Sequence, residues 1–175
     1  MILFRPHRHH QALADVPLDA LWRRGIRGLL LDLDNTLAHH HAYEVAPEAR
    51  AWIERAKSMG FQVFLYSNAL LVRSKKAAGL LGIETAPRAY KPVNFGLRAA
   101  LRRMNLEPCE VALIGDQLFT DVLAGKLGGL TTILIEPLSR KEWIHTRFFR
   151  RLEYWMGRRD VGKMEVLHRE EDPHG

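Results

Sequence analysis

Two aspartates one residue apart, Asp32 and Asp34, directly follow the apolar run at residues 29–31. A short run of this kind, opened by Gly28, predicts a fully buried parallel strand. The carboxylates then fall where the strand ends, and open α/β sheets bind their ligands at that edge. One aspartate could attack as a nucleophile while the other, partly desolvated, transfers protons. A buried strand running into a polar turn is the alternative, because Asp and Asn are favoured turn residues.

Polar residues of three further kinds follow later apolar runs of the chain. A hydroxyl with backbone amides suits phosphate oxygens, a lysine supplies a cation, and two carboxylates lie at the mouth of a predicted helix. Because strand ends converge in a doubly wound sheet, residues far apart in sequence are expected to meet at one edge. In chain order they are Ser67 with Asn68, Lys91 with Pro92, and Asp116 with Asp121.

The aspartates of this set predict a bound cation. At ~4 Å and an effective dielectric near 20, each pair of like charges repels by about 4 kcal/mol. Several such pairs would rival the whole stability of a domain, ~5–15 kcal/mol. Hard oxygen ligands left partly open to water suit Mg²⁺ best, and Lys91 would offset a further charge. The expected carboxylates are Asp32, Asp34, Asp116 and Asp121.

Apolar runs alternate with amphipathic stretches from Gly28 to about Pro137. This alternation predicts βαβ crossovers, a parallel sheet and helices on both faces, which is an α/β fold. The predicted helices span residues 47–59, 70–81, 93–104 and 121–127, and the predicted strands span 29–31, 61–66, 83–85, 110–114 and 131–135.

The same pattern divides the chain into four segments. Residues 1–27 form a lead-in that packs on the core, with a short helix near 18–24, and residues 28–137 form the domain that carries the site. Residues 138–160 are expected to form a basic amphipathic helix, and residues 161–175 a polar, flexible tail.

Composition is that of a globular protein of one domain. The 175 residues are 47% hydrophobic and 26% charged, which is ordinary for such proteins. No segment approaches the ~20 apolar residues of a membrane span, and residues 1–6 are too short an apolar stretch for a signal peptide. The single cysteine, Cys109, excludes an internal disulfide. We therefore expect a cytoplasmic protein.

The net charge of +6 predicts an anionic partner, which could be nucleic acid, an acidic membrane surface or a phosphorylated substrate. Residues 138–160 combine arginines with aromatic and aliphatic side chains at helical spacing. Such a helix can lie on an anionic membrane surface. It can equally pack its apolar face on its own domain, and charge alone does not choose between these arrangements.

Taken together and in this order, the motifs resemble those of the haloacid dehalogenase superfamily of phosphotransferases. The resemblance covers about residues 28–137 and implies a Rossmannoid three-layer sandwich around a parallel sheet. The matching motifs are Asp32-Leu33-Asp34-Asn35-Thr36, then Ser67, then Lys91, and finally Gly115-Asp116 with Asp121.

This resemblance implies a role for each residue that would handle the phosphoryl group. Asp32 would be the nucleophile that forms an aspartyl phosphate. Asp34 would protonate the leaving oxygen and then activate water. Ser67 and the Asn68 amide would hold phosphoryl oxygens, and Lys91 would bridge nucleophile and phosphate. Phosphoryl transfer depends mostly on positioning and charge neutralisation, which these groups supply.

The resemblance also implies a Mg²⁺ site. Asp32, the backbone carbonyl of Asp34 and Asp116 would be ligands, with Asp121 in support. An acidic residue at position 34 favours hydrolysis over a long-lived aspartyl phosphate.

Both usual places for a lid domain are nearly empty. Only a helix and a small flap fit between Asp34 and Ser67, and only one helix and a short strand fit between Ser67 and Lys91. An essentially capless site of this kind admits large substrates, such as a phosphoprotein, a nucleic-acid end or a lipid headgroup. An oligomeric partner could also cover it.

More narrowly, the chain resembles the YqeG-type phosphatases of subfamily IIIA, which are similar to phosphatidylglycerophosphate phosphatases. This implies a membrane-presented substrate, with phosphatidylglycerophosphate the leading candidate. A phosphatase of soluble or nucleic-acid phosphates is one alternative, and a non-catalytic module acting with a partner such as a GTPase is another. The resemblance lies in residues 21–28, the string at 32–37, the turn at 66–69, residues 88–92 and the basic aromatic stretch at 148–153.

Overall fold

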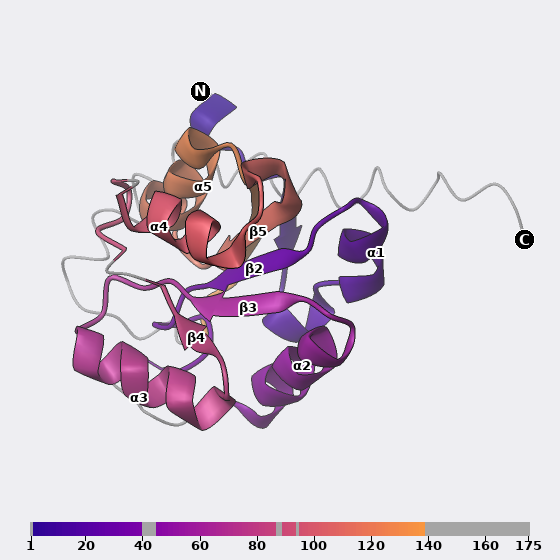
Figure 1. Cartoon of the computed structure of the whole chain (residues 1–175), viewed down its shortest axis with the longest axis vertical. Helices are drawn as coiled ribbons and strands as arrows, with labels where there is room; N and C mark the ends of the chain where they lie inside the picture. Colours follow the sequence, from indigo (N-terminus) through magenta and orange to yellow (C-terminus); the bar gives the residue numbers. More distant parts are fainter. Residues whose placement is uncertain (1, 40–44, 87–88, 94, 139–175) are drawn as a thin grey trace, which may run out of the picture.

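The computed structural model describes residues 2–39, 45–86, 89–93 and 95–138 (Figure 1). The predicted amphipathic helix at 138–160, apart from Leu138, and the predicted tail at 161–175 lie outside these ranges. No helix in the described ranges is long and apolar enough to cross a membrane.

A six-stranded sheet with the order β1-β6-β5-β2-β3-β4 forms the centre of the molecule. Every pair of neighbouring strands is parallel, which confirms the predicted α/β fold. Leu31 lies opposite both Leu65 and Ile114, so the carboxyl ends of β2, β3 and β5 lie side by side. The strands are β1 (Arg8–His10), β2 (Gly28–Leu31), β3 (Gln62–Leu65), β4 (Glu84–Thr85), β5 (Val111–Gly115) and β6 (Thr131–Ile135).

Helices cover both faces of this sheet (Figure 1). Leu29 and Leu31 pack in one hydrophobic cluster with residues of α1, α2 and α3. Leu30, between them, packs in a second cluster with residues of α4 and α5. This alternation follows from the period of two along a strand and makes a three-layer sandwich. The helices are α1 (Leu18–Arg23), α2 (Pro47–Ser58), α3 (Leu71–Leu81), α4 (Phe95–Met104) and α5 (Leu123–Gly128).

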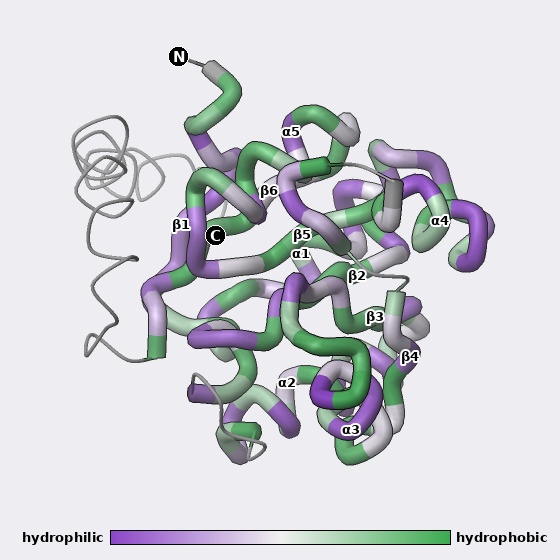
Figure 2. The backbone as a smooth tube through the Cα atoms, turned by 90° about the vertical axis from the view of Figure 1, so that its left-hand side faces the viewer, coloured by the Kyte–Doolittle hydropathy of each residue, from purple (hydrophilic) through white to green (hydrophobic). Residues whose placement is uncertain are grey.

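Local sequence explains the bounds of the helices. α2 begins at Pro47, where the fixed φ of proline suits the first helical position and no backbone N–H is lost. α3 ends at Leu81 and is capped by Gly82, whose φ of 59° lies in the left-handed region that glycine adopts without strain. Figure 2 shows the outcome, with hydrophobic strands β2, β5 and β6 at the centre of the molecule.

Two features differ from the elements expected from the sequence. β1 was not among the predicted strands, because its three polar residues show no apolar alternation; it forms by pairing with the edge of β6. The helix expected from Asp121 is a π-helical turn followed by α5. The short helical turns are η1 (Ile2–Phe4), η2 (Leu13–Asp15), η3 (Pro108–Glu110) and the π-helical η4 (Leu118–Val122).

The N-terminal segment is an integral part of the core. Leu13, Val16 and Leu21 are buried in the same cluster as α2, and the indole Nε1 of Trp52 donates a 2.9 Å hydrogen bond to the carbonyl of Val16. Residues before β2 therefore help to fix the helical layer beneath the site.

Candidate active site

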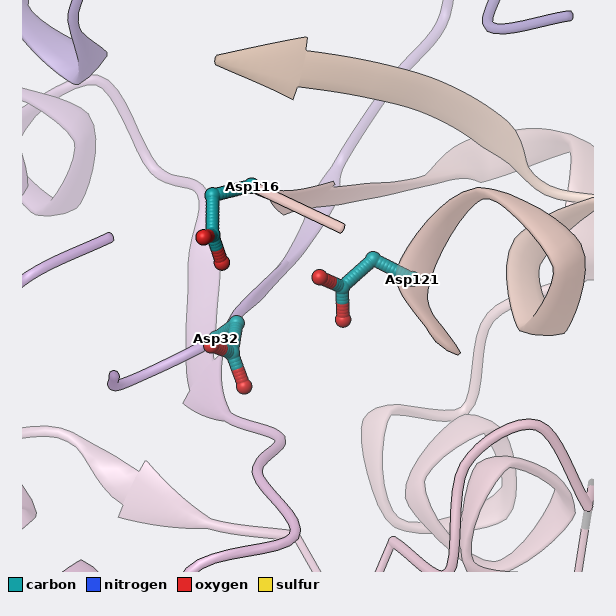
Figure 3. Close-up of side chains that lie close together, drawn as sticks. All are labelled: Asp32, Asp116 and Asp121. Atoms are coloured by element: carbon teal, nitrogen blue, oxygen red, sulfur yellow. The ribbon is translucent and has the colours of Figure 1, made fainter. Parts of the chain in front are cut away.

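Three buried carboxylates meet at the carboxyl edge of the sheet (Figure 3). Asp32 follows β2, Asp116 follows β5, and Asp121 lies in the π-helical turn η4. One oxygen from each lies within 4.8 Å of the others. The backbone N–H of Asp32 donates to the carbonyl of Ile114, which extends the β2–β5 pairing into the site. We call Asp32, Asp116 and Asp121 the acidic triad.

Lys91 bridges two members of the acidic triad. Its Nζ donates hydrogen bonds to Asp32 Oδ1 at 2.6 Å and to Asp121 Oδ1 at 2.5 Å. The Asn68 side chain fixes the lysine backbone, since its Oδ1 accepts from the Lys91 N–H and its Nδ2 donates to the Lys91 carbonyl. The ammonium also lies 5.7 Å from the centre of the Tyr66 ring, within cation–π range.

Burial sets the electrostatics of this cluster. Desolvation raises the pKa of Asp32 to about 6, although the neighbouring Lys91 acts to lower it. Burial acts to lower the pKa of Lys91, but Asp121 and Asp32 together raise it above its ordinary value. The ammonium is therefore retained at neutral pH. One ammonium does not balance the three carboxylates of the triad. Their hard oxygen donors suit a divalent cation such as Mg²⁺.

Gly115 leaves the space that Asp121 occupies. A Cβ at position 115 would lie 2.3 Å from the Asp121 Cγ, which is far inside van der Waals contact. The Asp121 carboxylate is held there, because its Oδ2 accepts a 3.1 Å hydrogen bond from the Gln117 N–H. The Gly-Asp motif thus pairs a glycine, whose lack of a side chain leaves room for Asp121, with the carboxylate of Asp116.

Asp34 does not join the acidic triad, contrary to the expectation that four carboxylates gather. Its Oδ1 accepts a 2.5 Å hydrogen bond from Arg73 Nη1, and both side chains are largely buried. Arg73 Nη2 also reaches the carbonyl of His39 at 3.5 Å. This second cation is not among the site residues predicted from the sequence. Its one sequence signal is an arginine in the first turn of the helix that follows Ser67.

Ser67 lies beside this edge of the sheet as expected. The N–H of the preceding Tyr66 donates to the carbonyl of Leu31, which extends the β2–β3 pairing as far as Asp32. Ser67 is buried, and its Oγ accepts a 3.1 Å hydrogen bond from the Ala69 N–H, so the turn is fixed in one conformation. The structure therefore brings residues from β2, β3, the loop before α4 and β5 to one place.

Comparison with known proteins identifies the family. Residues 40–129 match the family model described as haloacid dehalogenase-like hydrolase, a range that includes Ser67, Lys91, Asp116 and Asp121. The chain is 34% identical over 150 residues to Probable phosphatase YqeG of Bacillus subtilis (strain 168), covering 86% of this chain and 87% of that protein.

A plant protein and a solved structure extend the comparison. Phosphatidylglycerophosphate phosphatase 1, chloroplastic/mitochondrial, of Arabidopsis thaliana is 29% identical over 85% of this chain, which spans 45% of the longer plant protein. The fold matches that of the haloacid dehalogenase-like hydrolase SP0104 from Streptococcus pneumoniae, with a TM-score of 0.51, 14% identity, and coverage of 63% of this chain and 84% of that one. From these matches, the chain belongs to the haloacid dehalogenase-like hydrolases and is a phosphatase of that family.

Proposed function

We propose that this protein is a Mg²⁺-dependent phosphomonoester hydrolase that works through an aspartyl phosphate on Asp32. The observation that carries the proposal is the position of Asp32, a buried carboxylate at a strand end, bonded to Lys91 and adjacent to two further carboxylates. Burying three carboxylates around one lysine costs stability. An arrangement that costs stability is better explained by catalysis than by a structural role.

In the first step the Asp32 carboxylate attacks phosphorus and the bond from phosphorus to the ester oxygen breaks. Asp34 gives its proton to the leaving alkoxide, and the product alcohol departs. Ser67, the Asn68 amide and Lys91 hold the phosphoryl oxygens; Lys91 donates to the Asp32 carboxylate that receives the group, and Asn68 is bonded to the Lys91 backbone. Lys91 supplies positive charge without rearrangement, since Asn68 already fixes its backbone.

In the second step water attacks phosphorus of the aspartyl phosphate. Asp34, now a carboxylate, takes the proton from water, and the Asp32 carboxylate leaves as inorganic phosphate forms. Arg73 keeps the Asp34 side chain in one position through both steps by its 2.5 Å hydrogen bond. Arg73 is thus a positioning residue in this mechanism.

The acidic triad would hold the Mg²⁺ ion, together with the backbone carbonyl of Asp34. Bound there, Mg²⁺ would neutralise charge on the phosphoryl oxygens and on Asp32. The fit rests on the donor set, which consists of buried carboxylate oxygens within 4.8 Å of one another.

Phosphatidylglycerophosphate, presented at the inner face of a membrane to a cytoplasmic enzyme, is the substrate we propose. Two observations support it. The name of the plant relative specifies that phosphatase activity for that protein. Two described connections beside the site are also short, with residues 66–70 joining β3 to α3 and residues 116–117 joining β5 to η4, so neither of these two holds a lid domain that would keep out a large substrate.

Phosphate release from phosphatidylglycerophosphate in mixed micelles tests this function. Wild type and Asp32→Asn should be compared with and without Mg²⁺, beside a panel of soluble monoesters that includes oligonucleotide 3′-phosphates. We expect lipid turnover well above the panel, dependent on Mg²⁺ and lost in the variant. Turnover confined to soluble esters would support the phosphatase mechanism but reject phosphatidylglycerophosphate as the substrate. No turnover on any substrate would reject the enzyme and favour a binding module.

A further inference from the structure

Five large apolar side chains are exposed on two stretches that border the active site. Leu70 is 71%, Leu71 41% and Val72 80% exposed where the chain enters the first turn of α3, while Tyr90 is 58% and Val93 50% exposed on the loop before α4. Single exposed apolar residues are normal on any protein. Five on two adjoining stretches of the chain need an explanation, and we call these five residues the apolar rim.

The two loops of the apolar rim are joined beside the site. Asn68, two residues before Leu70, makes both of its side-chain hydrogen bonds with the backbone of Lys91. Tyr90 precedes that lysine, and the N–H of Val93 closes a turn by donating to the Tyr90 carbonyl at 2.8 Å. The rim therefore adjoins Asn68 and Lys91, the residues proposed to hold the phosphoryl group. The hydrophobic stretch that enters α3 faces the viewer in Figure 2.

The stretch of sequence that carries the apolar rim is basic. Residues 61–106, which include both loops, α3 and α4, contain eight lysines and arginines, of which Arg73 and Lys91 are buried in ion pairs, and a single acidic residue, Glu84. Glu84 is itself bonded to Arg103. Lys75 and Lys76 are exposed on the turn of α3 that follows Val72. Apolar side chains with neighbouring lysines are typical of proteins that lie on anionic bilayers, where each part contributes separately to binding.

We infer that the apolar rim docks on the surface of an anionic lipid bilayer. Its side chains enter the boundary between headgroups and acyl chains, and Lys75 and Lys76 lie at the level of the lipid phosphates. Docking brings the opening of the site to the headgroups, so that a lipid phosphomonoester reaches Asp32 without leaving the membrane. The inference rests on the proposed function for its substrate, and it does not involve residues 138–160.

Co-sedimentation of the full chain with vesicles tests the docking surface. Vesicles of phosphatidylglycerol with phosphatidylcholine should bind the protein, and vesicles of phosphatidylcholine alone should bind it at least about fivefold less tightly. Leu70→Ser/Val72→Ser should lower the affinity for anionic vesicles about tenfold. Lys75→Gln/Lys76→Gln should also lower it, and more at low salt than at high salt. Leu80→Ser is the matched control, because Leu80 is 49% exposed on α3 but away from the rim, and its binding should equal that of wild type.

Turnover of a soluble monoester separates docking from catalysis. The rim variants should retain wild-type turnover, which also shows that they fold. Equal vesicle binding by wild type and the Leu70→Ser/Val72→Ser variant would overturn the inference. So would a concentration-dependent dimer that the same substitutions abolish without a change in vesicle binding, because the rim would then meet a second copy. Vesicle binding by a wild type that hydrolyses nothing would instead contradict the proposed function and leave the docking surface in place.

Discussion

Arg73 donates a 2.5 Å hydrogen bond to Asp34 across 39 positions of the sequence, from the first turn of α3 to the turn after β2. Both partners are largely shielded from water, with side-chain exposures of 11% and 17%. Asp34 therefore has a cationic partner of its own, as Asp32 has in Lys91. The two aspartates, one residue apart in sequence, lie in different electrostatic surroundings.

Loss of the Arg73 contact should slow turnover more than it weakens substrate binding. Arg73→Gln removes the charge that fixes the Asp34 carboxylate, so kcat should fall about 10–100-fold with little change in KM. Arg73→Lys should restore part of the rate. Arg102→Gln, on an exposed position of α4, is the control and should behave as wild type. A fall in kcat/KM caused entirely by KM would show that Arg73 binds substrate instead.

Removal of the bridging lysine should destabilise the fold. Lys91→Met leaves Asp32 and Asp121 buried without their cation, and breaking such a buried pair costs about 3–5 kcal/mol. Adding Asp121→Asn removes one of the stranded charges and should restore part of the loss. Urea unfolding in the presence of a chelator measures both variants. Equal stability of Lys91→Met and its double variant would contradict the coupling between these side chains.

Asp32 should lower stability at neutral pH when no metal is bound. Burial raises its pKa from the usual 3.8 to about 6, so its contribution to folding is fully present below about pH 4 and is lost as pH rises through about 6. With a chelator at pH 7, Asp32→Asn should be more stable than wild type by about 2–3 kcal/mol, since each pKa unit is about 1.4 kcal/mol. Thermal unfolding between pH 4 and 8 should show the difference shrinking toward acid. A stability difference between the two proteins that grows toward acid pH would contradict the raised pKa of Asp32.

Mg²⁺ should raise the unfolding temperature, because an ion that binds only the folded chain stabilises it. Asp116→Asn should abolish this shift by removing a ligand of the acidic triad. Gly115→Ala should reduce it, since the added Cβ would displace the Asp121 carboxylate. Gly79→Ala is the matched control, because a Cβ there has open space and the helix gains propensity. An equal shift in all four proteins would place the ion elsewhere.

The sequence predicts the sheet and the meeting of its strand ends because those features depend on local pattern. Residues 29–31 form a buried strand because they are apolar on both faces, and parallel pairing then brings Asp32, Lys91 and Asp116 together. The match between pattern and structure is less complete at β1, where three polar residues become a strand only because β6 offers an open edge.

Arg73 lies beyond such prediction for a physical reason. An arginine in a helix is usually exposed to solvent, and nothing within α3 marks this one as buried. Its partner is fixed by how α3 packs against the sheet, which is a tertiary property. The same contact gives Asp34 a cationic partner outside the acidic triad, although its spacing from Asp32 predicts a shared site.

Detection of a phosphoryl group on Asp32 tests the central claim most directly. Wild type, Asp32→Asn and Asp34→Asn are mixed with p-nitrophenyl phosphate and Mg²⁺ and quenched in acid, and their peptides are examined by mass spectrometry. That substrate has a leaving group that needs little protonation, so Asp34→Asn should still form the aspartyl phosphate but hydrolyse it slowly. We expect the phosphorylated residue 32 peptide to accumulate in Asp34→Asn, to be scarce in wild type and to be absent in Asp32→Asn. Phosphate release by wild type with no label on this peptide in any of the three proteins would contradict the mechanism.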